Sequence, residues 1–228
     1  MSLLTLVRHG QASFGTQDYD RLPSVGERQA GLLGEHLAAI DRLPHALYSG
    51  TLRRQQHTAR IIAATTALEI AENPAFDEYD AAGLLKLHSA RHGTSIIELQ
   101  REDGSIDPRR FQRRLEAVGL AWVSGELADP SLETWHAFKS RVAAGLESVL
   151  SSAGRSERVM VCTSAGVVAA AVGHLLALDD QSTLRLSWSV HNSSITQVLF
   201  DGARRSLLSF NAVPHLESPA RRELITFR

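Results

Sequence analysis

The feature that most constrains the fold is a short apolar segment near the start of the chain. Residues 3–7 read Leu-Leu-Thr-Leu-Val and are followed directly by Arg8, His9 and Gly10. A short apolar run that contains β-branched residues predicts a buried strand, of the kind found in parallel sheets. Because ligands of open α/β sheets bind beyond the carboxyl ends of the strands, we expect Arg8 and His9 to face a ligand site.

The residue types at this strand end suit an oxygen anion. An arginine offers a rigid fork of hydrogen-bond donors, and an imidazole is able to act as a nucleophile or a base near neutral pH. Gly10 allows a sharp turn and the close approach of a ligand. An ordinary strand end with a surface arginine and a half-buried histidine is an equal alternative when these residues are considered by themselves.

Length and composition predict one globular domain with a sizeable core. The chain has 228 residues, a formal net charge of −1, 43 % hydrophobic residues and 21 % charged residues. These values are ordinary for a soluble enzyme, and the nearly neutral charge argues against nucleic acid or a membrane surface as a partner. We interpret residues 1–228 as a single domain with a helical insertion at about 84–153.

The sequence favours a cytoplasmic location. Its single cysteine, Cys162, excludes a disulfide within the chain, and the first strand begins at once with no signal peptide before it. The longest apolar stretch, residues 165–178, contains Gly173 and His174 and is too short for a membrane span.

The rest of the sequence alternates between predicted strands and helices, which is typical of an α/β fold. Strands are predicted at residues 46–49, 68–72, 158–163, 195–200 and 207–212, with a hairpin turn at 201–202. Helices are predicted at about 24–40, 51–67 and 165–178, with two more that begin at 107 and 129 and with segments over 84–106 that break near Gly93 and Gly104.

Three kinds of local signal set the predicted helix starts. Ser24 and Glu27 have the spacing of a capping box, and Thr51 is positioned to cap the next helix. Residues 107–108 and 129–130 both read Asp-Pro, which places proline at a first helical position.

A strand, a tight turn and a helix follow one another at residues 158–178. The strand leads into Ser164, Ala165 and Gly166, and the helix after them is almost wholly apolar. A helix N-terminus at the carboxyl end of a strand binds anions through its free N–H groups and its dipole. Ser164 and Ala165 are therefore candidate phosphate-binding residues.

Taken in order, these segments resemble the histidine phosphatase superfamily, whose members have the phosphoglycerate mutase-like fold. Residues 6–10 (Leu-Val-Arg-His-Gly) match its first motif, and residues 49–59 look like its second-arginine segment, which places the phosphate-binding arginine at Arg54. Residues 22–30 resemble its Leu-Thr-x-x-Gly-x-x-Gln-Ala segment, residues 76–78 its acid segment, and residues 192–196 and 210–216 its closing strands. The match covers nearly the whole chain outside residues 86–130.

The resemblance implies a three-layer αβα sandwich around a mostly parallel six-stranded sheet. It also implies a phosphatase that acts on a small phosphorylated metabolite through a phosphohistidine on His9, without a cofactor or a metal ion. Arg8 and Arg54 would hold the phosphoryl oxygens, and Glu78 would protonate the leaving group and then activate water.

The neighbours of these residues complete the candidate site. Gln11 and Ser13 follow the nucleophile and would add hydrogen-bond donors to phosphate. Asp77 and Asp80 compete with Glu78 for the role of the acid, and like-charge repulsion from them would raise the pKa of Glu78 if they lie close.

The chain departs from the family pattern at two positions. Ser164 stands where the family usually has a second active-site histidine, and Gly15 stands where it often has asparagine. A serine hydroxyl donates a hydrogen bond but carries no charge, so we expect turnover to suffer more than binding. His57 and His191 are alternative sources of that charge, although we expect a structural or solvent-facing role for each.

Two other functions stay open. One is phosphoglycerate mutase, which is less favoured because the segment after Glu78 lacks the Arg-His-Tyr-Gly that such mutases typically carry. The other is a regulatory protein that binds a phosphorylated ligand with little turnover, as Ser164 suggests. A homodimer is left open as a further partner. His88 and His92 are four residues apart, but no third metal ligand is evident, so we interpret them as surface histidines.

Overall fold

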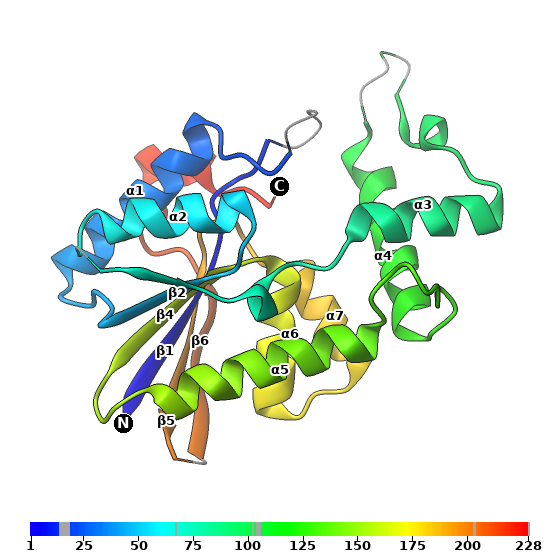
Figure 1. Cartoon of the computed structure of the whole chain (residues 1–228). Helices are drawn as coiled ribbons and strands as arrows, with labels where there is room; N and C mark the ends of the chain where they lie inside the picture. Colours follow the sequence, from blue (N-terminus) through cyan, green and yellow to red (C-terminus); the bar gives the residue numbers. More distant parts are fainter. Residues whose placement is uncertain (14–18, 67, 102, 104–105, 203, 228) are drawn as a thin grey trace.

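At the centre of the molecule is a six-stranded sheet with the order β3-β2-β4-β1-β5-β6 (Figure 1). The computed structural model describes residues 1–13, 19–66, 68–101, 103, 106–202 and 204–227. The strands are β1 (Ser2–Arg8), β2 (Ala46–Ser49), β3 (Ile70–Glu72), β4 (Arg158–Thr163), β5 (Ile195–Asp201) and β6 (Arg204–Ala212). β3, β2, β4 and β1 are parallel, whereas β5 is antiparallel to both β1 and β6. The predicted mostly parallel sheet is confirmed, as a mixed sheet in which β5 is reversed.

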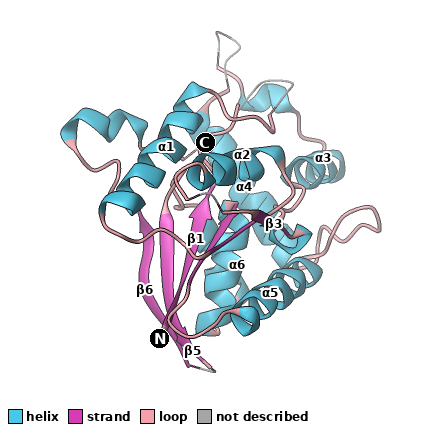
Figure 2. Ribbon diagram, turned by 60° about the vertical axis from the view of Figure 1, so that its left-hand side comes forward, coloured by secondary structure: helices cyan, strands magenta, loops and turns pink. Residues whose placement is uncertain are grey.

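Helices cover both faces of this sheet and form the predicted three layers (Figure 2). One face is covered by α1 (Ser24–Ala39) and α2 (Arg53–Ala63). The other is covered by α5 (Trp135–Ser152) and α6 (Ala165–Leu176), with α7 (Asp180–Ser187) packed beside α6. The chain ends with a short 3-10 helix at Pro219–Leu224, whose Leu224 packs with Val25 of α1.

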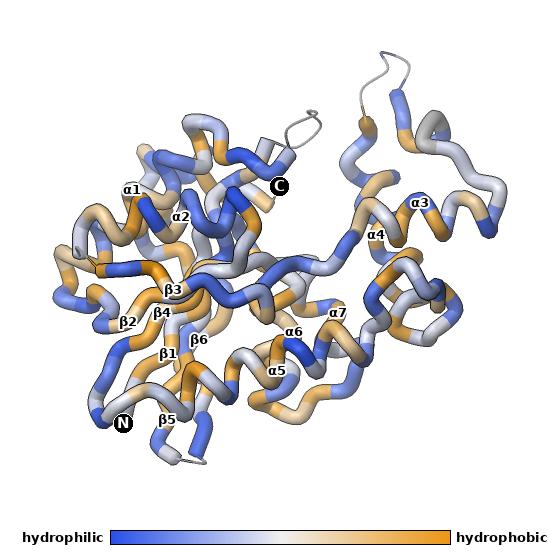
Figure 3. Tube along the Cα trace, viewed as in Figure 1, coloured by the Kyte–Doolittle hydropathy of each residue, from blue (hydrophilic) through white to orange (hydrophobic). Residues whose placement is uncertain are grey.

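The core consists of two main apolar clusters, one on each face of the sheet. Leu4 and Leu6 of β1 pack in the cluster that includes Phe138 of α5, whereas Val7 packs in the cluster that includes Leu33 of α1. Figure 3 shows hydrophobic residues concentrated along the central strands and α6. Because both faces of β1 are buried, its sequence is apolar without the alternation of a half-exposed strand.

Two helices between β3 and α5 stand beside the sandwich (Figure 1). They are α3 (Ala81–His92) and α4 (Pro108–Val123), with a 3-10 helix at Ile96–Leu99 between them. The ring of Trp122 in α4 lies 4.6 Å from that of Tyr79, 5.1 Å from Trp135 and 5.6 Å from Phe138, so an aromatic cluster joins this part to the core. The single domain with an insertion at about 84–153 stays a prediction.

The start predicted for α1 at Ser24 is confirmed, but the caps predicted for α1 and α2 do not form. Thr51 binds Asp77 through its backbone N–H and its hydroxyl, and the first N–H groups of α2 bind Asp20. α1 begins after Pro23 without a side-chain cap, so the capping box at Ser24 does not form. Asp77 and Asp20, which bind the start of α2, lie in loops far away in the sequence. A signal from neighbouring residues therefore does not predict them.

The helix start predicted at residues 129–130 is wrong. Asp129 accepts a hydrogen bond from the backbone N–H of Ser131 in a turn, and α5 begins later, with Thr134 as its N-cap. The start at Asp107 is confirmed, since its carboxylate caps α4. α7 was not predicted, and the strand predicted at 68–72 is shortened to β3.

The helix break predicted at Gly93 is confirmed, because this residue ends α3 with a φ of 62°. The second predicted break, at Gly104, lies outside the described residues. Among the helices of the described chain, none combines the length and the apolar character that a membrane span requires.

Candidate active site

Four loops meet at the carboxyl ends of β1 and β4. The backbone N–H of His9 donates to the Thr163 carbonyl at the end of β4 (2.8 Å), and the N–H of Gly10 donates to the Thr58 hydroxyl of α2 (3.1 Å). The N–H of Ser193 donates to the His9 carbonyl (3.2 Å). Because β5 is reversed, the loop before it lies at the same edge of the sheet as the loops after the parallel strands. Backbone contacts therefore fix His9 from three sides.

The imidazole of His9 lies between the Gly10 carbonyl and Arg54, and these two contacts decide which ring nitrogen carries the proton. His9 is 3 % exposed, its Nδ1 lies 2.7 Å from the Gly10 carbonyl oxygen, and Arg54 Nε donates to its Nε2 (3.1 Å). The arginine Nε–H is always a donor, so this network assigns the proton to Nδ1 and the lone pair to Nε2. Burial, and then the charges of Arg54 and Arg8, hold the pKa of His9 well below its usual value. The ring is therefore suited to nucleophilic attack through Nε2.

Arg54 is held at the first turn of α2 by an acidic residue from the polar loop. Arg54 Nη1 lies 2.7 Å from Asp20 Oδ1, and the same carboxylate accepts hydrogen bonds from the backbone N–H groups of Arg53 (2.8 Å) and Arg54 (3.3 Å). The ring of Tyr19 lies 5.2 Å from the Arg54 guanidinium carbon. The sequence analysis missed Asp20 and Tyr19, because nothing local distinguishes them from other loop residues.

Three other predicted phosphate ligands, Arg8, Gln11 and Ser13, form hydrogen bonds to other parts of the protein. Arg8 is half-buried, and its Nη1 donates to the Val190 carbonyl. The backbone N–H of Gln11 donates to the side chain of Gln29 (2.7 Å), and that of Ser13 to the Arg21 carbonyl (2.9 Å). The phosphate-binding roles of Gln11 and Ser13 stay predictions, and Gly15 lies outside the described residues.

Glu78 lies across the site, at the N-terminus of α6. Its Oε2 accepts a hydrogen bond from the backbone N–H of Gly166 (3.0 Å), and its Oε1 accepts one from the N–H of Tyr79 (3.3 Å). Part of the residue is exposed, but protein atoms enclose the carboxyl group, and this burial raises its pKa. The bond from Gly166 and the charge of Arg54 oppose the shift without cancelling it. A raised pKa keeps a carboxylic acid protonated and able to donate a proton.

The neighbouring acids have other roles. The Asp77 carboxylate binds Thr51, and Asp80 caps α3 by accepting a hydrogen bond from the Gly83 N–H (2.8 Å). The pKa of Glu78 is thus raised, as the sequence analysis expected, but through burial and not through repulsion from Asp77 and Asp80.

Gly166 is required where Glu78 meets α6. A Cβ atom at this position would lie 2.3 Å from Glu78 Oε1 and 2.8 Å from Tyr79 Cε1, both far inside contact distance. Gly166→Ala is therefore expected to displace the Glu78 carboxyl group. If this group acts as a general acid, turnover falls by about 100-fold. Activity assays together with thermal unfolding measure the effect.

The matched control for this substitution is Gly31→Ala. Gly31 also lies in a helix, and a Cβ there meets no atom within 4 Å. Gly31→Ala should leave turnover unchanged and raise stability by up to about 1 kcal/mol, since alanine favours the helix. Equal activity of Gly166→Ala and the parent protein would show that activity does not depend on the contact between Glu78 and α6.

Ser164 lies at the turn between β4 and α6 and is 1 % exposed. Its Oγ accepts a hydrogen bond from Gln55 Nε2 (2.8 Å), which also donates to the Phe76 carbonyl (3.0 Å). Thr163 Oγ1 donates to the same carbonyl (2.7 Å). The Gln55 side chain of α2 therefore links the turn before α6 to the segment that leads to Glu78. Ala165, the first residue of α6, follows Ser164 at the same turn.

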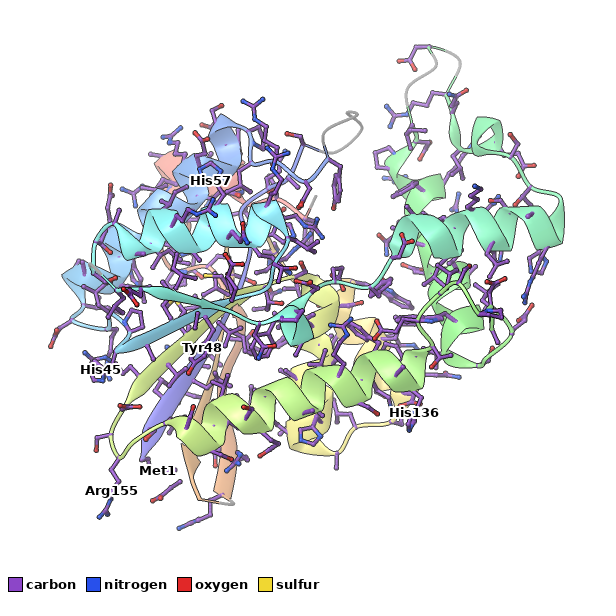
Figure 4. All side chains as sticks on the ribbon, viewed as in Figure 1. Met1, His45, Tyr48, His57, His136 and Arg155 are labelled. Atoms are coloured by element: carbon purple, nitrogen blue, oxygen red, sulfur yellow. The ribbon has the colours of Figure 1, made fainter. Side chains whose placement is uncertain are left out.

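The structure places the alternative histidines at the margins of this arrangement. His57 Nε2 lies 3.8 Å from Glu27 Oε1, and Figure 4 shows His57 on the outer side of α2. His191 Nδ1 lies 3.1 Å from Asn211 Oδ1, and its ring is 4.3 Å from that of Phe227. The solvent-facing role expected for His57 agrees with its position.

The second pair of histidines, His88 and His92, lies on α3, beside the sandwich. The rings of His88 and His92 stack with their centroids 4.3 Å apart. Within the part of the chain that the structure describes, no group of three or more His, Cys, Asp or Glu side chains is arranged to hold a metal ion.

Comparison with known proteins gives the same picture at the level of sequence family and fold. A sequence model described as "Histidine phosphatase superfamily (branch 1)" matches residues 4–213. A search of curated proteins found no match.

Among solved structures, a phosphoserine phosphatase from Entamoeba histolytica in complex with 3-phosphoglyceric acid is 21 % identical, with a TM-score of 0.65 over 95 % of this chain and 100 % of that chain. A mycobacterial glucosyl-3-phosphoglycerate phosphatase complexed with VO3 is 21 % identical, with a TM-score of 0.66 over 93 % and 100 %. A phosphoglycerate mutase from Bacillus anthracis is 16 % identical, with a TM-score of 0.65 over 94 % of each chain. At these identities the likeness shows the shared fold.

Proposed function

Because the chain belongs to the histidine phosphatase superfamily (branch 1), we propose that it is a phosphatase that hydrolyses a small phosphorylated substrate through a phosphohistidine on His9. The observation that carries this proposal is the pairing of a histidine whose pKa is lowered with a carboxylic acid whose pKa is raised. The lone pair of His9 Nε2 is directed at Arg54, and the pKa of Glu78 is raised on the opposite side of the site.

In the first step the phosphoryl group passes from the substrate to the histidine. Arg8 and Arg54 bind the equatorial oxygens, and Arg54 exchanges its bond to His9 for a bond to phosphate. His9 Nε2 attacks phosphorus, the bond from phosphorus to the leaving oxygen breaks, and Glu78 donates its proton to that oxygen. The products are an alcohol and a phosphohistidine.

In the second step water takes the place of the alcohol. Glu78, now ionised, accepts a proton from water while the water oxygen attacks phosphorus. The phosphorus–nitrogen bond breaks, inorganic phosphate leaves, and His9 and Glu78 return to their starting protonation states.

The Asp20 carboxylate competes with phosphate for Arg54. It already occupies one donor of Arg54, so a bound phosphate has to share Arg54 with it or displace it. The negative charge of Asp20 next to Arg54 also limits how strongly the site attracts phosphate. These features support a site that releases inorganic phosphate after each turnover.

The segment after Glu78 favours a phosphatase over a mutase. Tyr79 and Asp80 follow the acid, and α3 begins at Ala81, so the Arg-His-Tyr-Gly typical of phosphoglycerate mutases is absent from this sequence. Release of inorganic phosphate from p-nitrophenyl phosphate and from alkyl phosphates tests the proposal directly. Binding of phosphate without release from either substrate would favour the regulatory phospho-ligand-binding protein.

The pH dependence of kcat/KM provides a second test. Activity requires neutral His9, whose pKa is lowered, and protonated Glu78, whose pKa is raised. The rate is therefore expected to rise as the pH increases through the pKa of His9 and to fall as the pH increases through the pKa of Glu78, which gives a bell-shaped profile. Glu78→Gln should lower the maximum and remove the alkaline fall.

Asp80→Asn is the matched control for the pH profile, because asparagine is also able to cap α3. It should leave both limbs in place. An unchanged alkaline limb in Glu78→Gln would assign the proton donor to another group.

A further inference from the structure

Arg141 of α5 binds two partners, the segment of the chain that leads to Glu78 and the carboxylate of Glu133. Its Nη1 donates to the backbone carbonyls of Pro74 (3.1 Å), Ala75 (3.0 Å) and Asp77 (3.0 Å). Its other two nitrogens form a fork on Glu133, with Nε 2.9 Å from Oε1 and Nη2 2.7 Å from Oε2. A single guanidinium group therefore binds three carbonyl oxygens of the same turn.

This pattern is not that of an ordinary surface ion pair. A partly exposed pair such as Arg141 and Glu133, whose side chains are 27 % and 30 % exposed, contributes little to stability by itself. Glu133 instead fixes the plane of the guanidinium, because a bidentate pair has a defined geometry. The fixed plane directs Nη1 at the carbonyls.

The carbonyls bound by Arg141 belong to the short 3-10 helix Pro74–Phe76 and to the residue after it. Side chains on the other side hold the same segment, since Gln55 and Thr163 both donate to the Phe76 carbonyl. Gly145 of α5 packs on it so closely that a Cβ would lie 2.5 Å from the Ala75 side chain. Arg141 is therefore the polar clamp on the α5 side of this segment.

The next residue after the clamped segment is the acid itself. Asp77, whose carbonyl Arg141 binds, is directly followed by Glu78, whose carboxyl group reaches the N–H of Gly166. A shift of the clamped turn by a fraction of a hydrogen-bond length moves the carboxyl group relative to α6 and to His9. Misplacement of catalytic groups by about 1 Å costs roughly 100-fold in rate.

We propose that Arg141, with its plane set by Glu133, is a positioning residue for the proton donor Glu78. This rests on the proposed function and adds to it the element that fixes the acid. Arg141 acts through the backbone of residues 74–77, to which it is bound.

The kinetic test compares leaving groups, using kcat/KM because it reports the steps up to release of the alcohol. A poor leaving group such as the glycerol of β-glycerol phosphate needs the proton from Glu78, whereas p-nitrophenolate leaves without it. Arg141→Gln is expected to lower kcat/KM for β-glycerol phosphate by about 30-fold and for p-nitrophenyl phosphate by less than about threefold. Glu133→Gln, which leaves the arginine in place, should show the same selectivity with a smaller loss.

The matched control is Arg205→Gln. Arg205 Nη2 pairs with Glu147 of α5 (3.2 Å), and its Nη1 donates to the carbonyls of Gly202 and Arg204, at the far end of the sheet from the segment before Glu78. This variant should leave the ratio of the two kcat/KM values unchanged. Equal losses on both substrates in Arg141→Gln, or no loss on either, would overturn the proposal.

A second measurement does not depend on turnover. The backbone N–H of Gly166 donates to Glu78 Oε2, so its amide NMR resonance titrates with the ionisation of Glu78. Arg141→Gln and Glu133→Gln are expected to shift the midpoint of this titration, and Arg205→Gln is not. If the parent protein releases no phosphate, the proposed function fails, and this titration still decides the positioning role: an unchanged midpoint in both variants would overturn it.

Discussion

Replacing His9 by alanine is expected to lower kcat by at least about 10⁴-fold while the protein stays folded. The loss follows from the removal of the nucleophile, since in other enzymes single members of a catalytic unit account for losses of this order. The fold is kept because the His9 backbone makes the contacts to Thr163 and Ser193, and alanine preserves them. Arg54 loses the bond to Nε2 and keeps its ion pair with Asp20.

Rapid-quench labelling with a radioactive phosphoryl donor measures this result. The parent protein should form an acid-labile phosphoryl adduct, and His9→Ala should form none while it still binds phosphate or vanadate. His57→Ala is the matched control, because His57 lies on the outer side of α2 beside Glu27 (Figure 4). Turnover in His9→Ala at the level of the parent would reject His9 as the nucleophile.

Ser164→His is expected to raise kcat by roughly 100-fold and to change KM much less. The family pattern usually has a histidine at the position of Ser164. We therefore expect the new imidazolium of Ser164→His to face the transferring phosphoryl group. A donor of that kind is worth roughly 2.7–4 kcal/mol in the transition state of other enzymes, and an interaction made mainly in the transition state raises kcat. Ser164 provides a hydroxyl that is already bound to Gln55 and carries no charge.

The buried position of Ser164 makes a size control necessary. Ser164→Asn introduces a side chain of intermediate size without a charge, and it should leave kcat flat or lower it. Thermal unfolding of both variants shows whether the turn accepts the larger side chain. If Ser164→His folds normally and kcat does not rise, another residue already supplies the charge, and His191 is the first one to replace.

The central strands could be predicted from the sequence because their signal is local. β2 and β4 have the predicted bounds, and β1 was predicted from its uninterrupted apolar run. A strand buried on both faces needs apolar residues at every position, so its pattern does not depend on which elements cover it. The order of motifs along the chain then singled out Arg54 and Glu78 as candidate partners of His9.

The parts that could not be predicted depend on contacts between distant residues. Asp20 caps α2 from a loop more than thirty positions earlier, and Gln55 reaches Ser164 across more than a hundred positions. Arg141 binds a turn that precedes it by more than sixty positions. Capping and positioning of this kind leave no periodic signal, so aspartates and arginines with such roles look like solvated residues in the sequence.

The order of strands in the sheet also has a consequence for synthesis of the protein. Leu3 of β1 lies opposite Arg158 of β4 on one side and Leu199 of β5 on the other. At ribosomal rates of about 5–20 residues per second, β1 is without either neighbour for roughly 8–30 s, until β4 has been made, and without β5 for a few seconds more. An apolar strand that waits so long is a natural target for chaperones. His9 reaches its final place only after the residues that follow β4 and precede β5 have been made, since its backbone is bound to Thr163 and Ser193.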